Sequence, residues 1–97
     1  MLRKPRTVLE SIIFTDGKIV RHYPRGNDHF VEFLDYCENP MKIRFTETSR
    51  VEELADVSER EVMDAAFDRD DGGWTVIFKD DDGEPILVIG YRDAELV

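Results

Sequence analysis

Residues 58–79 read SEREVMDAAFDRDDGGWTVIFK and place a helical pattern directly before a strand pattern. Ser58 and Glu61 have the S-x-x-E spacing of a capping box, which marks the start of a helix. We therefore predict a helix from Glu59 to the run Asp70–Gly73, where glycine can adopt the left-handed conformation that ends helices. The apolar positions of this helix are Val62, Met63, Ala66 and Phe67.

The residues after the glycines alternate between apolar and polar, which is typical of a half-buried strand. Residues 74–79 form this predicted strand, residues 80–84 a turn, and residues 85–91 its partner strand. The C-terminal part of the chain is thus predicted to be a helix followed by a hairpin.

The N-terminal half yields a similar mixture of elements. Residues 7–15 and 18–23 are rich in β-branched residues and flank Asp16–Gly17, which predicts a hairpin. Phe30, Phe33, Leu34 and Cys37 have the i, i+3, i+4, i+7 spacing of an amphipathic helix over residues 28–38. A strand over 41–46 and a short helix from Ser49 complete the pattern.

These elements predict the α+β class, in the order ββαβααββ, with a mainly antiparallel sheet covered by two or three short helices. The length of 97 residues fits a single domain over residues 1–97. Residues 1–6 contain three basic side chains and are predicted to be a flexible N-terminal arm.

The net charge of −9 is distributed unevenly along the chain. Residues 1–50 hold nine basic and seven acidic side chains, whereas residues 51–97 hold four basic and fifteen acidic ones. An acidic chain is repelled by phosphates, so direct binding to nucleic acid or to an anionic membrane is not expected. A basic protein partner is expected instead.

The single cysteine, Cys37, cannot form an intrachain disulfide. The longest apolar run, Ile86–Ile89 with Gly90 and Tyr91, is far shorter than the ~18 residues of a membrane helix. These features predict a cytoplasmic protein.

The acidic second half predicts a small non-enzymatic inhibitor that presents a carboxylate face to the basic site of a nucleic-acid-processing protein, by mimicry of nucleic acid. Phage anti-defence proteins of the anti-CRISPR kind and toxin-immunity proteins belong to this class. The expected partner-binding residues are Glu52, Glu53, Asp56, Glu59, Asp64, Asp68, Asp70, Asp71, Asp80, Asp81 and Asp82.

Three alternatives stay open. Acidity can serve solubility alone, for instance in a salt-adapted organism. A metal-independent ribonuclease or phosphodiesterase could use His22 as acid or base with Tyr23, and Arg21 and Arg25 as phosphate ligands. A structural protein could form a homodimer through the edge of the apolar strand Ile86–Tyr91.

No cofactor or metal is expected from the motifs. Asp80–Glu84 resembles a calcium loop in composition, but an alignment with Gly83 at the sixth position puts Phe78 at the first, where a ligand is required. One cysteine and two histidines are too few for a structural zinc site.

Overall fold

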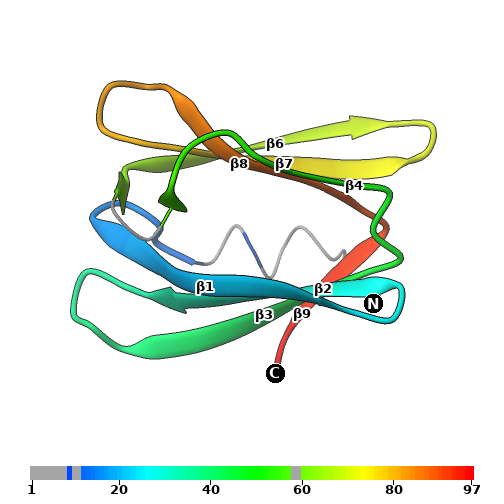
Figure 1. Ribbon diagram of the computed structural model, residues 1–97, viewed down its shortest axis with the longest axis horizontal. Coiled ribbons are helices and arrows are strands. Elements are labelled where there is room, and N and C mark those ends of the chain that lie inside the picture. Colours follow the sequence, from blue (N-terminus) through cyan, green and yellow to red (C-terminus); the bar gives the residue numbers. More distant parts are fainter. Residues whose placement is uncertain (1–8, 10–11, 58–59) are drawn as a thin grey trace, which may run out of the picture.

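Two antiparallel β-sheets pack face to face in the computed structural model, which describes residue 9, residues 12–57 and residues 60–97 (Figure 1). The five-stranded sheet has the order β5 (Glu61–Val62), β1 (Gly17–Arg25), β2 (Asp28–Leu34), β3 (Pro40–Thr46) and β9 (Asp93–Leu96). The four-stranded sheet has the order β4 (Arg50–Glu53), β8 (Pro85–Tyr91), β7 (Gly73–Lys79) and β6 (Asp64–Asp70).

The predicted α+β class is wrong, because the two longest predicted helices are strands. Residues 28–34 form β2 in place of a helix over 28–38, and residues 64–70 form β6 in place of a helix from Glu59. The short helix expected from Ser49 is likewise replaced by β4. The predicted capping residue Ser58 and the predicted first helical residue Glu59 lie outside the described residues.

In β2 a period of two overrides the helical stripe. His29, Val31 and Phe33 are buried at alternate positions, whereas the stripe residues Phe30 and Leu34 lie on the opposite face. Phe30 stacks there on Tyr23, with ring centroids 5.6 Å apart. Both patterns fit the same letters, and pairing with β1 and β3 on either side selects the strand.

In β6 tertiary pairing overrides helix propensity. The strand pairs with β7 along its whole length, from Asp64 opposite Lys79 to Asp70 opposite Gly73. Ala65 and Phe67 lie opposite Phe78 and Val76 and share the inner face with them. Helix propensity differs by only tenths of a kcal/mol per residue among ordinary residues, so a ladder of this length outweighs it.

The predicted N-terminal hairpin is also wrong. Strand β1 confirms the expectation for residues 18–23, but it pairs with β2 and β5. Phe14 precedes β1 as a loop residue whose ring contacts Phe33 at 5.2 Å and Phe78 at 5.5 Å. The segment before β1 therefore inserts a side chain between the sheets, while residues 1–6, the predicted arm, lie outside the described residues.

The strands expected over 41–46, 74–79 and 85–91 are confirmed as β3, β7 and β8, whereas β9 was missed. Strand β9 reads Asp-Ala-Glu-Leu, with only Ala94 buried, so its composition resembles a loop. It pairs with β3, next to Ile43–Thr46, after the chain crosses from one sheet to the other.

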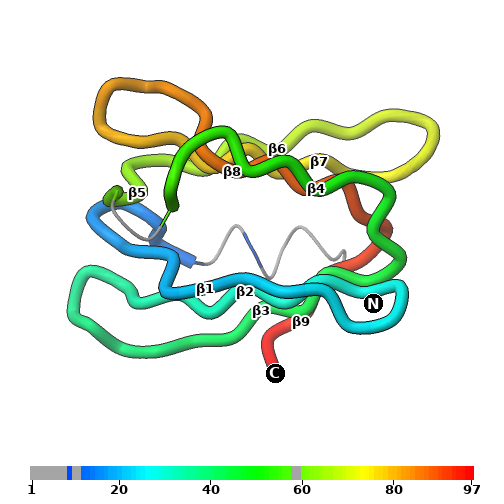
Figure 2. The backbone as a smooth tube through the Cα atoms, viewed as in Figure 1, coloured from blue at the N-terminus to red at the C-terminus, as the bar shows by residue number. Residues whose placement is uncertain are grey.

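Two crossings between the sheets lie side by side at one end of the sandwich (Figure 2). The amide of Ser49, between β3 and β4, donates to the carbonyl of Gly90 at 2.9 Å. The amide of Arg92, between β8 and β9, donates to the carbonyl of Thr46 at 3.0 Å. These bonds fix the two sheets to each other at this end.

The core lies between the sheets and consists of their inward alternate side chains. A fully buried Val, Leu, Ile or Phe side chain stabilises the folded state by ~1.5–3 kcal/mol relative to an exposed one. The buried hydrophobic residues with no exposed surface include Ile19, Val31, Phe33, Ile43, Phe45, Val76, Phe78, Leu87 and Ile89, with Leu9 from outside the sheets. Among the described residues, no helix has the length and apolar character needed to cross a bilayer.

Candidate functional site

The outer face of β6 carries a row of carboxylates. Asp64, Asp68 and Asp70 lie on the same face because their positions in the strand differ by even numbers, and all three are exposed. Positions two apart on one face of a strand are ~6.6–6.8 Å apart. We call these three residues the acidic row; Asp71, in the turn that follows, extends it.

The acidic row has no ion-pair partner in the described part of the chain. Three acids of the five-stranded sheet differ from the acidic row because they have arginine partners. Asp28 pairs with Arg44 at 2.8 Å, and Glu32 pairs with Arg21 at 2.9 Å. The hydrogen bonds from these guanidinium groups lower the pKa of Asp28 and of Glu32. Glu95 also pairs with Arg44, at 3.1 Å.

The predicted acids of β4 point to opposite faces of the four-stranded sheet. Glu52 lies opposite Val88 on the outer face and pairs with Arg50 at 2.9 Å, which lowers the pKa of Glu52. Glu53 lies opposite Leu87 on the inner face and contacts His22. The pleat of the strand therefore separates two acids that the sequence placed together.

The predicted carboxylate face is only partly assembled. Strands β4 and β6 form opposite edges of the four-stranded sheet, with β8 and β7 between them. Neighbouring strands are ~4.7–4.9 Å apart, so about 14 Å separates Glu52 from the acidic row across the same face. Asp56 is exposed and engaged in an interaction, and Glu59 lies outside the described residues.

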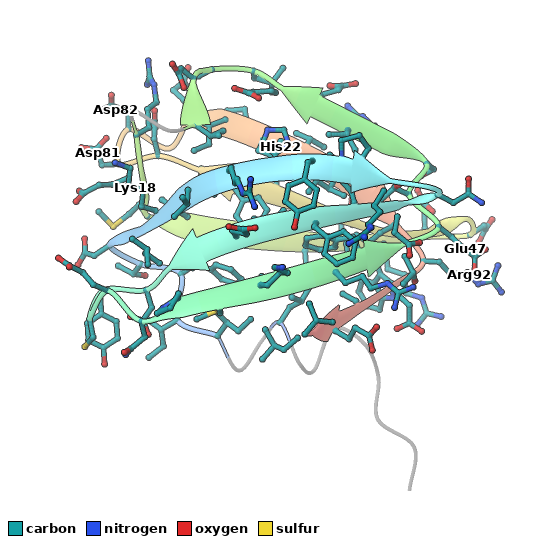
Figure 3. All side chains as sticks on the ribbon, turned by 60° about the horizontal axis from the view of Figure 1, so that its bottom comes forward. Lys18, His22, Glu47, Asp81, Asp82 and Arg92 are labelled. Carbon is teal, nitrogen blue, oxygen red and sulfur yellow. The ribbon has the colours of Figure 1, made fainter. Side chains whose placement is uncertain are left out.

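The Asp-rich turn between β7 and β8 has a structural centre. Asp80 is buried and pairs with Arg60 at 2.7 Å. Its other oxygen accepts hydrogen bonds from the amides of Asp82 and Glu84, both at 3.0 Å. These bonds, that of Glu84 foremost, lower the pKa of Asp80. Of the three aspartates, Asp81 and Asp82 are exposed, and they lie at the end of the sandwich opposite Arg92 (Figure 3).

The four residues of the predicted ribonuclease patch do not come together. Arg21 and Tyr23 share the outer face of β1, where the guanidinium lies 5.0 Å from the ring centroid. His22 lies on the other face, toward β4 (Figure 3). The backbone of Arg25 lies opposite Asp28 at the end of the β1–β2 hairpin. The enzymatic alternative therefore stays a prediction to which this arrangement adds no support.

His22 belongs instead to a hydrogen-bonded series that sequence reasoning missed. Its Nε2 lies 2.7 Å from Oε1 of Glu53, and its Nδ1 lies 2.8 Å from Nε2 of His29. His29 is buried, and burial, with the nearby charge of His22, lowers the pKa of His29 to about 4. These side chains come from β1, β2 and β4, and no sequence motif links them. Both ring nitrogens of His22 therefore have hydrogen-bond partners within the protein.

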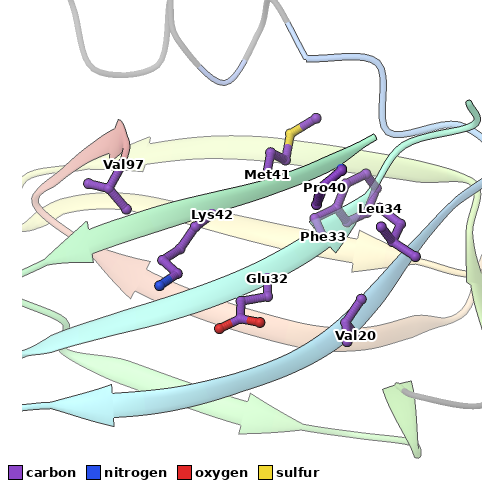
Figure 4. Close-up of a pocket in the computed structure, with 8 residues that line it drawn as sticks. All are labelled: Val20, Glu32, Phe33, Leu34, Pro40, Met41, Lys42 and Val97. Atoms are coloured by element: carbon purple, nitrogen blue, oxygen red, sulfur yellow. The ribbon is translucent and has the colours of Figure 1, made fainter. Parts of the chain in front are cut away.

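A hollow of about 490 Å³ lies on the five-stranded sheet (Figure 4). Its apolar wall includes Val20, Leu34 and Met41, and its charged groups are Glu32 and Lys42. Glu32 already accepts hydrogen bonds from Arg21 and Tyr23, so the one carboxylate that lines the hollow is engaged within the protein.

Among the described residues, one group of side chains has donor atoms close enough to hold a metal ion: Asp80, Asp81 and Asp82, within 4.8 Å of one another. Asp80 already uses both oxygens for Arg60 and the turn amides. The group is therefore explained as a structural turn, in line with the failed calcium-loop spacing.

The strand that was expected to offer an open edge, Ile86–Tyr91, lies inside β8 and is paired on both sides, with β4 and β7. A homodimer through this strand would have to displace one of them. The open edges of the four-stranded sheet are β4 and β6.

Comparison with protein families, with characterised proteins and with solved structures found no match for this chain.

Proposed function

We propose that this protein is a small acidic binding module, an inhibitor that presents the acidic row to the basic site of a nucleic-acid-processing protein. The observation that carries the proposal is the contrast between the acidic row and the paired acids of the five-stranded sheet. The row is exposed and has no ion-pair partner among the described residues, whereas Asp28 and Glu32 are neutralised by arginine.

Unpaired carboxylates along a strand have a cost that ion pairing would remove, because like charges on one face repel one another. A partner with lysine and arginine side chains removes this repulsion and gains charge-assisted hydrogen bonds. A groove that binds nucleic acid is lined with such side chains and recognises a line of anions. This complementarity supports nucleic-acid mimicry as the mode of inhibition.

The test compares two variants of equal net charge. Asp64→Asn/Asp68→Asn/Asp70→Asn removes the acidic row, and Glu38→Gln/Glu61→Gln/Glu84→Gln removes three exposed acids elsewhere. Tagged wild-type protein captures partners from a lysate, and the captured protein is then purified and titrated with all three forms. We expect the captured partner to be a basic protein that binds nucleic acid. The wild-type protein should displace nucleic acid from this partner.

The acidic-row variant should bind that partner at least tenfold more weakly, and the control variant less than threefold. Raising the salt concentration from 0.05 M to 0.5 M should weaken wild-type binding, because salt screens exposed charges. Equal binding by both variants, or affinity that does not depend on salt, would overturn the proposal.

A further inference from the structure

Strand β6 has a backbone partner on one side only, as far as the described residues show. It is the last strand of the four-stranded sheet and pairs only with β7. The strand is seven residues long and contains no proline. On this open side the described residues supply no strand or loop as a backbone partner; the amide of Arg69 donates to the side chain of Asp68 at 3.1 Å. Such an edge accepts an added strand.

The outer face of this edge selects the charge of an added strand. The acidic row would face every second side chain of a neighbouring strand. A second copy of β6 would bring carboxylates opposite carboxylates, which is destabilising. A strand with lysine or arginine at alternate positions would pair with the row instead.

The inner side of the same edge offers a hollow that is lined by apolar side chains together with Thr15 and Asp64. Its volume is about 260 Å³, and it lies between Ala65 and Phe67 of β6 and the segment Ile12–Phe14. Ile13 is 58% exposed there, so its side chain is accessible to a bound segment. The side chains of an added strand that point inward would contact this hollow.

We infer that the open edge of β6 binds an extended basic segment of the partner, which adds to the four-stranded sheet as a fifth strand. Lysine or arginine side chains of the segment alternate with aliphatic ones: the basic set contacts the acidic row and the aliphatic set contacts Ile13 and Phe67. Backbone hydrogen bonds supply affinity, and the two faces supply specificity. The inference rests on the proposed function, since it names the chemistry of the partner at the same acids.

Synthetic peptides of seven residues test the inference. The probe alternates lysine or arginine with valine; a second peptide has the same sequence with alternate backbone amides N-methylated; a third has the same composition with the basic residues grouped together. Affinity is measured by fluorescence anisotropy at 0.05 M salt, and hydrogen exchange reports which strand is protected.

The alternating peptide should protect the amides of β6 and not those of β4. N-methylation and regrouping should each weaken binding at least tenfold, because the first removes backbone hydrogen bonds and the second removes the alternation. Ile13→Ser should weaken binding of the alternating peptide three- to tenfold. The thermal transition of the Ile13→Ser protein shows whether that variant is folded. Val20→Ser, at an exposed aliphatic residue of β1 in the other sheet, is the matched control and should bind the alternating peptide as tightly as the wild type does.

Strand addition would be overturned if the three peptides bound with equal affinity and Asp64→Asn/Asp68→Asn/Asp70→Asn lowered the affinity for all three. That result would leave the proposed function intact. Protection of β4 in place of β6 would also overturn it. If the triple variant changes neither peptide binding nor partner binding, the proposed function fails together with the inference.

Discussion

Nε2 of His22 lies 2.7 Å from Oε1 of Glu53 and thereby links the two sheets of the sandwich. The carboxylate accepts a hydrogen bond from the N–H at Nε2 of His22. Nδ1 of His22 and Nε2 of His29, 2.8 Å apart, share one further hydrogen, so that one ring donates and the other accepts. If both rings were protonated, two N–H groups would face each other between His22 and His29.

Acid should destabilise the protein through His29. The folded pKa of about 4 lies below the ordinary value of 6.5, so the unfolded chain binds the proton more tightly. The stabilising effect of neutral His29 is thus complete above pH 6.5 and is lost as the pH falls toward 4. Between pH 7 and pH 5 the loss should be about 2 kcal/mol of unfolding free energy.

Urea unfolding at a series of pH values checks this expectation, with His29→Leu as the comparison. The variant should show a smaller decrease in unfolding free energy between pH 7 and pH 5 than the wild type. Parallel curves for the two proteins would show that His29 is not the group responsible.

Removing the hydroxyl of Tyr91 should not destabilise the fold. The ring is buried and packs edge-on against Phe45, with centroids 4.8 Å apart, but the hydroxyl has no hydrogen-bond partner among the described residues. Burial raises the pKa of this hydroxyl. Tyr91→Phe should leave the unfolding free energy unchanged or raise it by up to ~1 kcal/mol, since it removes an unsatisfied polar atom.

Tyr91→Ala serves as the control for this site and should cost about 3–5 kcal/mol, because it removes the ring and leaves a cavity. Thermal and urea unfolding measure both variants. A loss of more than 1 kcal/mol in Tyr91→Phe would reveal a hydrogen bond to this hydroxyl.

Gly17 is fixed by close packing at the start of β1. A methyl group there would lie 2.1 Å from the ring of buried Phe33 and 2.9 Å from the carbonyl oxygen of Leu34. Gly17→Ala should therefore destabilise the protein by about 1–3 kcal/mol through overpacking. Gly72→Ala, where the nearest atom is 3.5 Å away on exposed Asp70, should change stability by less than ~0.5 kcal/mol. Differential scanning calorimetry compares the two variants, and similar transition temperatures would contradict this assignment.

Asp80 should be the one acid of its turn on which stability depends. Asp80→Ala removes the partner of Arg60 and of the amides of Asp82 and Glu84, and should lower the urea midpoint. Asp82→Ala, at an exposed position, should leave the midpoint within error. Because the pKa of Asp80 is lowered in the folded state, its contribution is present at neutral pH and is lost as the pH falls through that pKa. Equal midpoints for the two variants at pH 7 would refute the structural role.

The strands that alternate cleanly were predictable, and those whose letters also fit a helix were not. Trp74, Val76 and Phe78 admit only a half-buried strand, and β7 confirms that pattern. The stripe of Phe30, Phe33 and Leu34 fits a helix and a strand equally well. Only the presence of β1 and β3 on either side decides between them, and that information is not local.

The candidate site shows the same division. The acids of β6 could be named from the sequence, but their spacing in space could not. In the predicted helix Asp64 and Asp68 would be one turn apart, whereas in the extended strand β6 they lie farther apart along the edge of the sheet. The separation of Glu52 from Glu53 by the pleat, and the contact of Glu53 with His22, depend on sheet pairing.

The sequence by itself determined the charge of the molecule and its concentration in the second half. It also determined the alternating strands β3 and β7 and the continuously apolar strand β8. Tertiary structure decided which acids are neutralised by arginine, which face each one occupies, and that β6 is an edge. Charge is additive and can be counted along a chain, whereas strand pairing joins residues far apart in sequence, such as Ile43 and Leu96. The energy that selects a strand over a helix therefore comes from partners that no local window contains.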